Sequence, residues 1–180
     1  MWDREGKCVL SWSRDGTVRV WDVRANKALA EHKHPDWVLG ASWGPEGKRV
    51  LSWSEDGTVR VWDVGANTKI AEHKHPAELL GASWDPGGER VLSGSKDGTM
   101  RAWDVGANKA LAEYTHPHRV LGASRDPGGK LILSWSEDGT VLVWDVSANM
   151  KVAEHKLPGG LFRASWGPEG KRVLAWRSPA

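Results

Sequence analysis

The feature that most constrains this chain is a repeat of 41 residues. Trp-Asp pairs mark each copy, at Trp21-Asp22, Trp62-Asp63, Trp103-Asp104 and Trp144-Asp145. An Asp-Gly-Thr triplet keeps the same phase, beginning at Asp15, Asp56, Asp97 and Asp138, and a Ser-x-Ser precedes each triplet. A fixed period of a few tens of residues indicates stacked copies of one small structural unit, each burying its apolar face against the next. No linker interrupts the phase, so the whole chain is one array.

Each copy has the pattern of short strands joined by tight turns. In the second copy we expect strands at 38–43, 48–54, 58–63 and 68–74, because these runs are rich in β-branched and aromatic residues. Asp56-Gly57 between two such runs predicts a hairpin, since glycine supplies the positive φ of the turn. The segment NKALAEHK at 26–33 also suits a helix. At about eight residues such a helix is unstable alone, so we favour a strand there.

These motifs together resemble the WD-repeat β-propeller family. The resemblance covers essentially all 180 residues, as four near-identical copies and a partial fifth. It implies an all-β fold in which each blade is a four-stranded antiparallel sheet and the blades surround a central channel. It also implies one hydrogen-bonded network per blade, formed by a loop His, a Ser, the turn Asp and the strand Trp. The matching sets are His34, Ser52, Asp56 and Trp62; His75, Ser93, Asp97 and Trp103; and His116, Ser134, Asp138 and Trp144. Ser54, Ser95 and Ser136 share a face with the first serines, so either serine can join.

The chain departs from the family at its two ends. Leu157 stands where the fourth loop His belongs, and the last copy has Ala175 and Arg177 at the two serine positions. Counting strands as a to d within a blade, we expect b-c-d in 1–33, full repeats in 34–74, 75–115 and 116–156, and a-b in 157–180. Four blades are few for a propeller, and an open arc exposes sheet faces and strand edges.

We therefore expect a homodimer in which two half-rings form one eight-bladed propeller. The joint residues are Cys8, Val9 and Leu10 at one end and Leu161, Phe162 and Trp166 at the other. The first b strand, 7–13, is favoured at the joint, with the tail from about Gly167 displaced or loosely attached. The alternatives are a chain that closes alone into four blades, a piece of a longer array, and another oligomer.

Partner recognition is expected on the rim that the variable loops share in this family. Strand sequences are nearly copied, whereas the loops differ between copies. The candidate rim residues are Arg14, Trp37, Glu55, Glu78, Lys96, Arg119 and Glu137. Drift at tolerant loop positions explains the same variation without any ligand.

Other chemistry has little support. The net charge of +2 does not suggest nucleic acid, and no apolar run is long enough to span a membrane. The single cysteine excludes an intrachain disulfide, and the start of the chain lacks a secretory signal, so we expect a cytoplasmic protein. His32-Lys33-His34 lacks the further ligands of a metal site, and the Ser, His and Asp of each copy match a structural network better than a hydrolase triad. We expect no catalytic residue, cofactor or metal.

Thirteen of the fifteen aromatic residues are tryptophans. Those at Trp12, Trp53, Trp135 and Trp176 face away from the network serines and are expected to pack between blades, while Gly94 takes that place in the third copy. The sequence thus predicts a non-catalytic protein-interaction scaffold that self-associates into a closed propeller. The alternative is a purely structural or engineered self-assembling fragment with no selected ligand.

Overall fold

The computed structural model describes residues 1–158 and 163–176, and in these residues it is built of β-strands. The first sheet has three strands, β1 (Cys8–Trp12), β2 (Thr17–Asp22) and β3 (Lys27–Lys33). The second sheet has four, β4 (Val38–Trp43), β5 (Arg49–Ser54), β6 (Thr58–Asp63) and β7 (Thr68–Lys74). The third has β8 (Leu79–Trp84), β9 (Arg90–Ser95), β10 (Thr99–Asp104) and β11 (Lys109–Thr115). The fourth has β12 (Val120–Arg125), β13 (Leu131–Ser136), β14 (Thr140–Asp145) and β15 (Met150–Lys156). The last pairs β16 (Arg163–Trp166) with β17 (Val173–Trp176).

All strand pairs are antiparallel, and each sheet is a meander whose order follows the chain. This confirms the all-β class and the four-stranded sheets, and the segment 26–33 forms a strand, β3, not a helix. The turns adopt the backbone that their residues favour. Gly57 has a φ of 81° and Asn67 a φ of 51°, and the other copies repeat both values closely.

The core lies between sheets as well as within them. Leu10, Val18 and Val20 of the first sheet share one apolar cluster with Val50 and Trp62 of the second. Equivalent clusters join the second sheet to the third, the third to the fourth, and the fourth to the last. Strands β1, β5, β9 and β13 contact β4, β8, β12 and β16 of the following sheet. Each sheet is thus stabilised by its neighbours, as in other repeat arrays.

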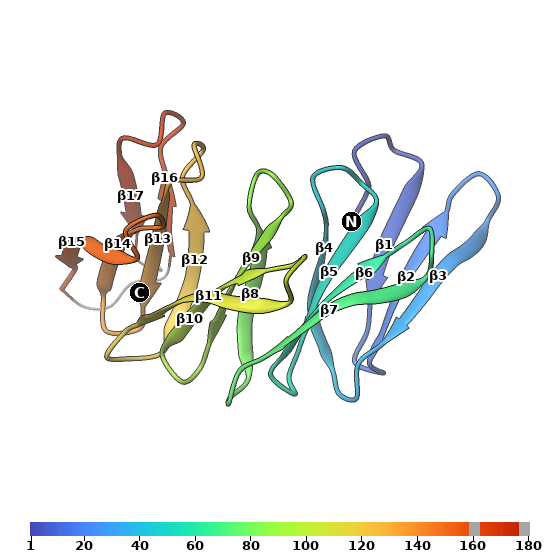
Figure 1. The fold of residues 1–180 in the computed structure, drawn as a ribbon, viewed down its shortest axis with the longest axis horizontal. Helices are drawn as coiled ribbons and strands as arrows, with labels where there is room; N and C mark the ends of the chain where they lie inside the picture. Colours follow the sequence, from blue (N-terminus) through green and yellow to red (C-terminus); the bar gives the residue numbers. More distant parts are fainter. Residues whose placement is uncertain (159–162, 177–180) are drawn as a thin grey trace.

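The five sheets follow one another in sequence order in an open row, with β1–β3 and β16–β17 at opposite ends (Figure 1). At the first end, Met1 and Leu10 exchange backbone hydrogen bonds of 2.8 Å, and Trp2 bridges Val9. At the other end β17 pairs with β16, from Arg163↔Trp176 to Trp166↔Val173. The described part of the tail is therefore paired within the single chain, and its displacement in a dimer stays a prediction. Leu161 and Phe162 lie outside the described residues.

Within the described residues, no helix has the length and apolar character needed to cross a membrane.

Candidate functional site

A hydrogen-bonded chain fixes the loop that enters each four-stranded sheet. Trp62 Nε1 donates to Ser52 Oγ over 2.8 Å, and Ser52 Oγ lies 2.7 Å from His34 Nε2. The second and third sets repeat these distances within 0.1 Å, through Ser93 and through Ser134. The structure thus resolves which serine joins. Ser54, Ser95 and Ser136 instead bind backbone or turn atoms at the start of each hairpin.

The turn aspartate reaches the histidine through a threonine that the sequence analysis missed. Thr58 Oγ1 donates to Asp56 Oδ1 over 2.6 Å and lies 3.0 Å from His34 Nδ1. Because the Trp62 N–H donates to Ser52, the Ser52 hydroxyl can donate to His34 Nε2. His34 Nδ1 then carries the proton and donates to Thr58 Oγ1, whose hydroxyl donates to Asp56. The signal was in the repeated Asp-Gly-Thr triplet, of which only the aspartate was given a role.

The threonine link weakens along the chain. Thr99 Oγ1 lies 3.4 Å from His75 Nδ1, and in the third set Thr140 binds Asp138 while His116 Nδ1 has no hydrogen-bond partner among the described residues. The chain of five groups is therefore complete in the first set and interrupted in the third.

Burial makes these histidines neutral at physiological pH. Desolvation lowers the pKa of His34, His75 and His116 to about 4, because a buried imidazolium loses its hydration. Burial acts the other way on Asp56 by favouring its neutral form, but hydrogen bonds from Thr58 prevail and lower the pKa of that carboxyl. The site therefore holds one charge, on the aspartate at its outer end.

Burial of the serine argues against the hydrolase interpretation. A Ser–His separation of 2.7 Å suits a nucleophile and its base. However, Ser52 is fully buried, and its oxygen already accepts the Trp62 N–H. No substrate can reach this hydroxyl without unfolding the blade, so the trio acts as a clamp on the loop. In the part of the chain that the structure describes, no group of His, Cys, Asp and Glu could hold a metal ion.

The last aromatic residue of strand d covers the network Trp of the next sheet. His32 stacks on Trp62 with ring centroids 4.5 Å apart and an interplanar angle of 11°. His73 stacks on Trp103 at 4.4 Å, and Tyr114 lies against Trp144 at 5.0 Å. The covered tryptophans are 7–9% exposed. His32 is therefore a packing residue, which agrees with the structural role expected for the His-Lys-His segment.

At the two ends of the row, the residues that would form this ring contact have no partner sheet in the described structure. Trp21 keeps its hydrogen bond to Ser11, at 2.8 Å, but its ring is 38% exposed because no sheet precedes it. His155, 41 residues after Tyr114, is exposed at the end of β15. Leu157, at the missing loop histidine, packs against the apolar cluster of the fourth sheet. The first end therefore exposes the Trp21 ring, and the other end exposes His155, a residue of the type that covers such a ring inside the chain.

The expected joint residues lie where the row ends. Cys8 and Val9 are half-buried in β1, and Leu10 is buried against the second sheet. Trp166 is half-buried in β16 against the fourth sheet, and its Nε1 donates to the Ser124 carbonyl over 3.3 Å. Leu10 and Trp166 thus already pack within the chain, and Cys8 and Val9 lie on an edge of β1 that Met1–Asp3 already pair with.

The expected rim residues lie on turns and loops that are bonded to each other. The backbone amides of Glu55, Lys96 and Glu137 donate to the carbonyls of Trp37, Glu78 and Arg119 over 2.9–3.0 Å. The Arg14 guanidinium lies 4.7 Å from the centre of the Trp37 ring, and Lys96 pairs with Glu78. Trp37 is 44% exposed. These backbone bonds hold the turn of each hairpin against the loop that enters the same sheet, and six of the expected rim residues stand on these paired segments.

Comparison with known proteins agrees with this geometry. A family model described as "WD domain, G-beta repeat" matches residues 26–63, 67–104 and 108–145, which together make up more than half of the chain. A search of curated proteins gave no match to the chain.

Proposed function

Because the chain belongs to the WD40 repeat family, whose domains are typically non-catalytic protein-interaction scaffolds, we propose that it is such a scaffold and that two copies join into one eight-bladed ring. The rim of variable loops is the surface offered to a partner protein. The ends of each half-ring are the surfaces that the two copies offer to each other.

The self-association is supported by a difference in exposure between Trp21 and the other network tryptophans. Trp62, Trp103 and Trp144 are covered by a ring from the preceding sheet, and Trp21 is not. In an eight-bladed ring, β15 of a second copy would take the place of that preceding sheet and bring His155 over Trp21. The same contact occurs three times inside the chain, so the ends need no new type of interface.

At the joint, β16 has two possible partners, its own β17 and β1 of a second copy, and the serine positions favour β1. In the complete sheets, Ala41 and Ala82 of strand a face Ser52 and Ser93 of strand b. At the end of the row, Ala164 faces Ala175, which has no hydroxyl for an indole N–H. Pairing β16 with β1 of a second copy would place Ser11 there, and Ser11 already accepts the hydrogen bond of Trp21. This pairing requires β17 to leave β16 and Met1–Asp3 to leave the edge of β1.

The mass of the particle in solution tests this proposal. Light scattering coupled to size exclusion at micromolar concentration should give twice the chain mass of 19.8 kDa. Trp21→Asp and His155→Glu should move the mass toward 19.8 kDa, because each introduces a charge into the joint. The matched control is Leu111→Glu, since Leu111 is equally exposed, at 40%, but lies on the outer strand β11. A wild-type mass of 19.8 kDa contradicts the dimer.

A pull-down tests the role of the rim. We expect the wild-type ring to retain a partner protein that is lost from both Trp37→Ala and Arg119→Ala, whereas Leu111→Ala keeps it. Retention by all four proteins would place binding elsewhere. If nothing is retained by the wild type, the result supports the alternative, a structural assembly with no selected ligand.

A further inference from the structure

Strand β9 lacks the large side chain that its counterparts carry. Trp53 in β5 and Trp135 in β13 stand opposite glycines of strand a, Gly40 and Gly122. A Cβ atom on Gly40 would lie 2.1 Å from Trp53 Cζ2, and one on Gly122 would lie 2.3 Å from Trp135 Cζ2. Each indole therefore lies flat against the backbone of strand a, over a seat that only glycine leaves free.

In the third sheet the glycine of strand a is present, but the indole that would cover it is missing. Gly94 occupies the tryptophan position and faces Gly81 across the strands. A Cβ atom built on Gly81 would meet nothing within 4 Å, in contrast to Gly40 and Gly122. The nearest atom of the following sheet is Val120 Cγ1, which would lie 3.3 Å from a Cβ on Gly94. Val120 therefore narrows the space beside Gly94, whereas the space above Gly81 stays open.

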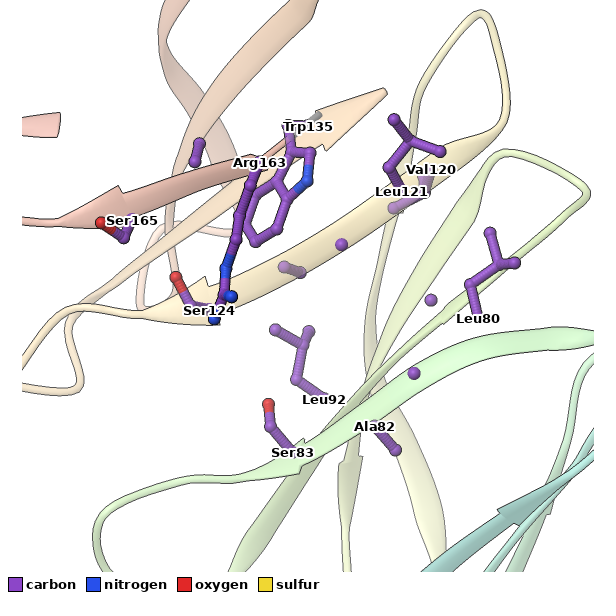
Figure 2. A pocket seen from close by; sticks show the side chains of 15 residues that line it. Leu80, Ala82, Ser83, Leu92, Val120, Leu121, Ser124, Trp135, Arg163 and Ser165 are labelled. Carbon is purple, nitrogen blue, oxygen red and sulfur yellow. The ribbon is translucent and has the colours of Figure 1, made fainter. Parts of the chain in front are cut away.

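This space belongs to a half-open hollow of about 560 Å³ that extends along β8, β12 and β16 (Figure 2). Leu80, Leu92, Val120 and Leu121 supply apolar walls, and Trp135 of the next sheet supplies an aromatic one. Ser83, Ser124, Ser165 and the Arg163 side chain supply its polar part. Mostly apolar walls with a few polar groups are typical of pockets that bind small ligands. An apolar cavity left by a missing side chain can accept a free ring of that size.

We propose that the seat over Gly81 is a binding site for an indole-sized planar aromatic ring. The ring would lie on the backbone of strand a as Trp53 lies on Gly40. The site is formed within one chain, so it does not depend on the joining of two copies. It also differs from the rim, because its walls are strands and not the variable loops.

Titration calorimetry with indole itself tests the site. We expect one indole per chain for the wild type. Gly94→Trp places a tethered indole in the seat and should weaken binding at least tenfold. Trp53→Gly opens the equivalent seat in the second sheet and should raise the stoichiometry from one to two, which keeps the test valid if Gly94→Trp does not fold. N-acetyl-tryptophanamide is the second ligand, since it carries the ring on a peptide-like backbone.

Each outcome is decisive. Binding of both ligands supports a site for an aromatic side chain of a partner segment, and binding of indole alone supports a site for a small molecule. Wild-type protein that binds neither ligand at millimolar concentration overturns the proposal. Undiminished indole binding by a folded Gly94→Trp variant also overturns it, because the ligand then lies elsewhere.

Discussion

Acid should unfold this protein well above the pKa of ordinary carboxyl groups, because five histidines are buried and burial lowers the pKa of each, including His32 and His73. The three loop histidines of the networks have the largest shifts. His34, His75 and His116 are 1–6% exposed, and desolvation lowers each pKa to about 4 from an ordinary value of 6.5. The unfolded chain therefore takes up protons first as the pH falls. The stability of the folded state is complete above pH 6.5 and is lost progressively as the pH falls from there to 4.

The size of the loss follows from the two pKa values. Each histidine should lower the free energy of unfolding by about 0.8 kcal/mol at pH 6, about 2 kcal/mol at pH 5 and about 3 kcal/mol at pH 4. Together the three amount to about 6 kcal/mol at pH 5, which is comparable with the whole stability of a small domain. We expect an acid midpoint near pH 5. The lowered pKa values of Asp56 and Asp97 act in a lower window, since those carboxylates stabilise the fold until the pH falls below their ordinary values.

Urea unfolding followed by far-ultraviolet circular dichroism, at fixed protein concentration from pH 7.5 to 5, measures this loss. His116→Gln is the informative variant, because His116 Nδ1 makes no hydrogen bond among the described residues and the substitution disturbs the fold least. It should reduce the loss between pH 7 and 5 from about 6 to about 4 kcal/mol. His118→Gln, on an exposed loop position, is the control and should leave the loss unchanged. A free energy of unfolding that is constant from pH 7 to 5, or a His116→Gln variant with the full loss, would refute the reasoning.

Two further predictions concern the loops that the networks hold. Thr58→Val removes the hydroxyl that joins His34 to Asp56 and should cost about 1–3 kcal/mol of unfolding free energy, whereas Thr140→Val should cost less because Thr140 makes no bond to His116; equal losses in urea would contradict the relay. Gly57→Ala should cost more than about 2 kcal/mol, since its φ is 81° and the new Cβ would lie 2.7 Å from the His75 carbonyl oxygen. Gly47→Ala, with a φ of 70° and open space around it, should cost only about 1 kcal/mol, and thermal melts that rank the two in reverse order would show that the loop contact does not matter.

Local patterns made most of the architecture predictable. The expected strand at 58–63 is β6 itself, and that at 48–54 differs from β5 by one residue, because the Asp56-Gly57 turn fixes where both strands end. The residue types of the His34 network were also predictable, but the choice of Ser52 over Ser54 was not, because the two serines share a face of the strand. The side-chain contacts between neighbouring sheets could not be predicted from the sequence. The stack of His32 on Trp62 joins residues of different sheets, and no pattern within one repeat shows which ring covers which.

In the proposed dimer, a leucine in place of histidine at position 157 suits a surface that has to be stable both before and after two copies join. A histidine there would need a serine and a threonine from the next sheet, and in a separate chain its ring would have neither. Such a half-satisfied network is costly when it is buried. The end faces avoid this cost, because Trp21 is already bonded to Ser11, Asp15 binds Thr17 and Leu157 has no polar atom to satisfy. Covering these faces with a second copy would bury mainly apolar surface, and the stability of the joint should come from the Trp21 and Leu157 contacts. The polar atom that it would add is His155 Nε2, whose counterparts in His32 and His73 are buried without a hydrogen-bond partner among the described residues.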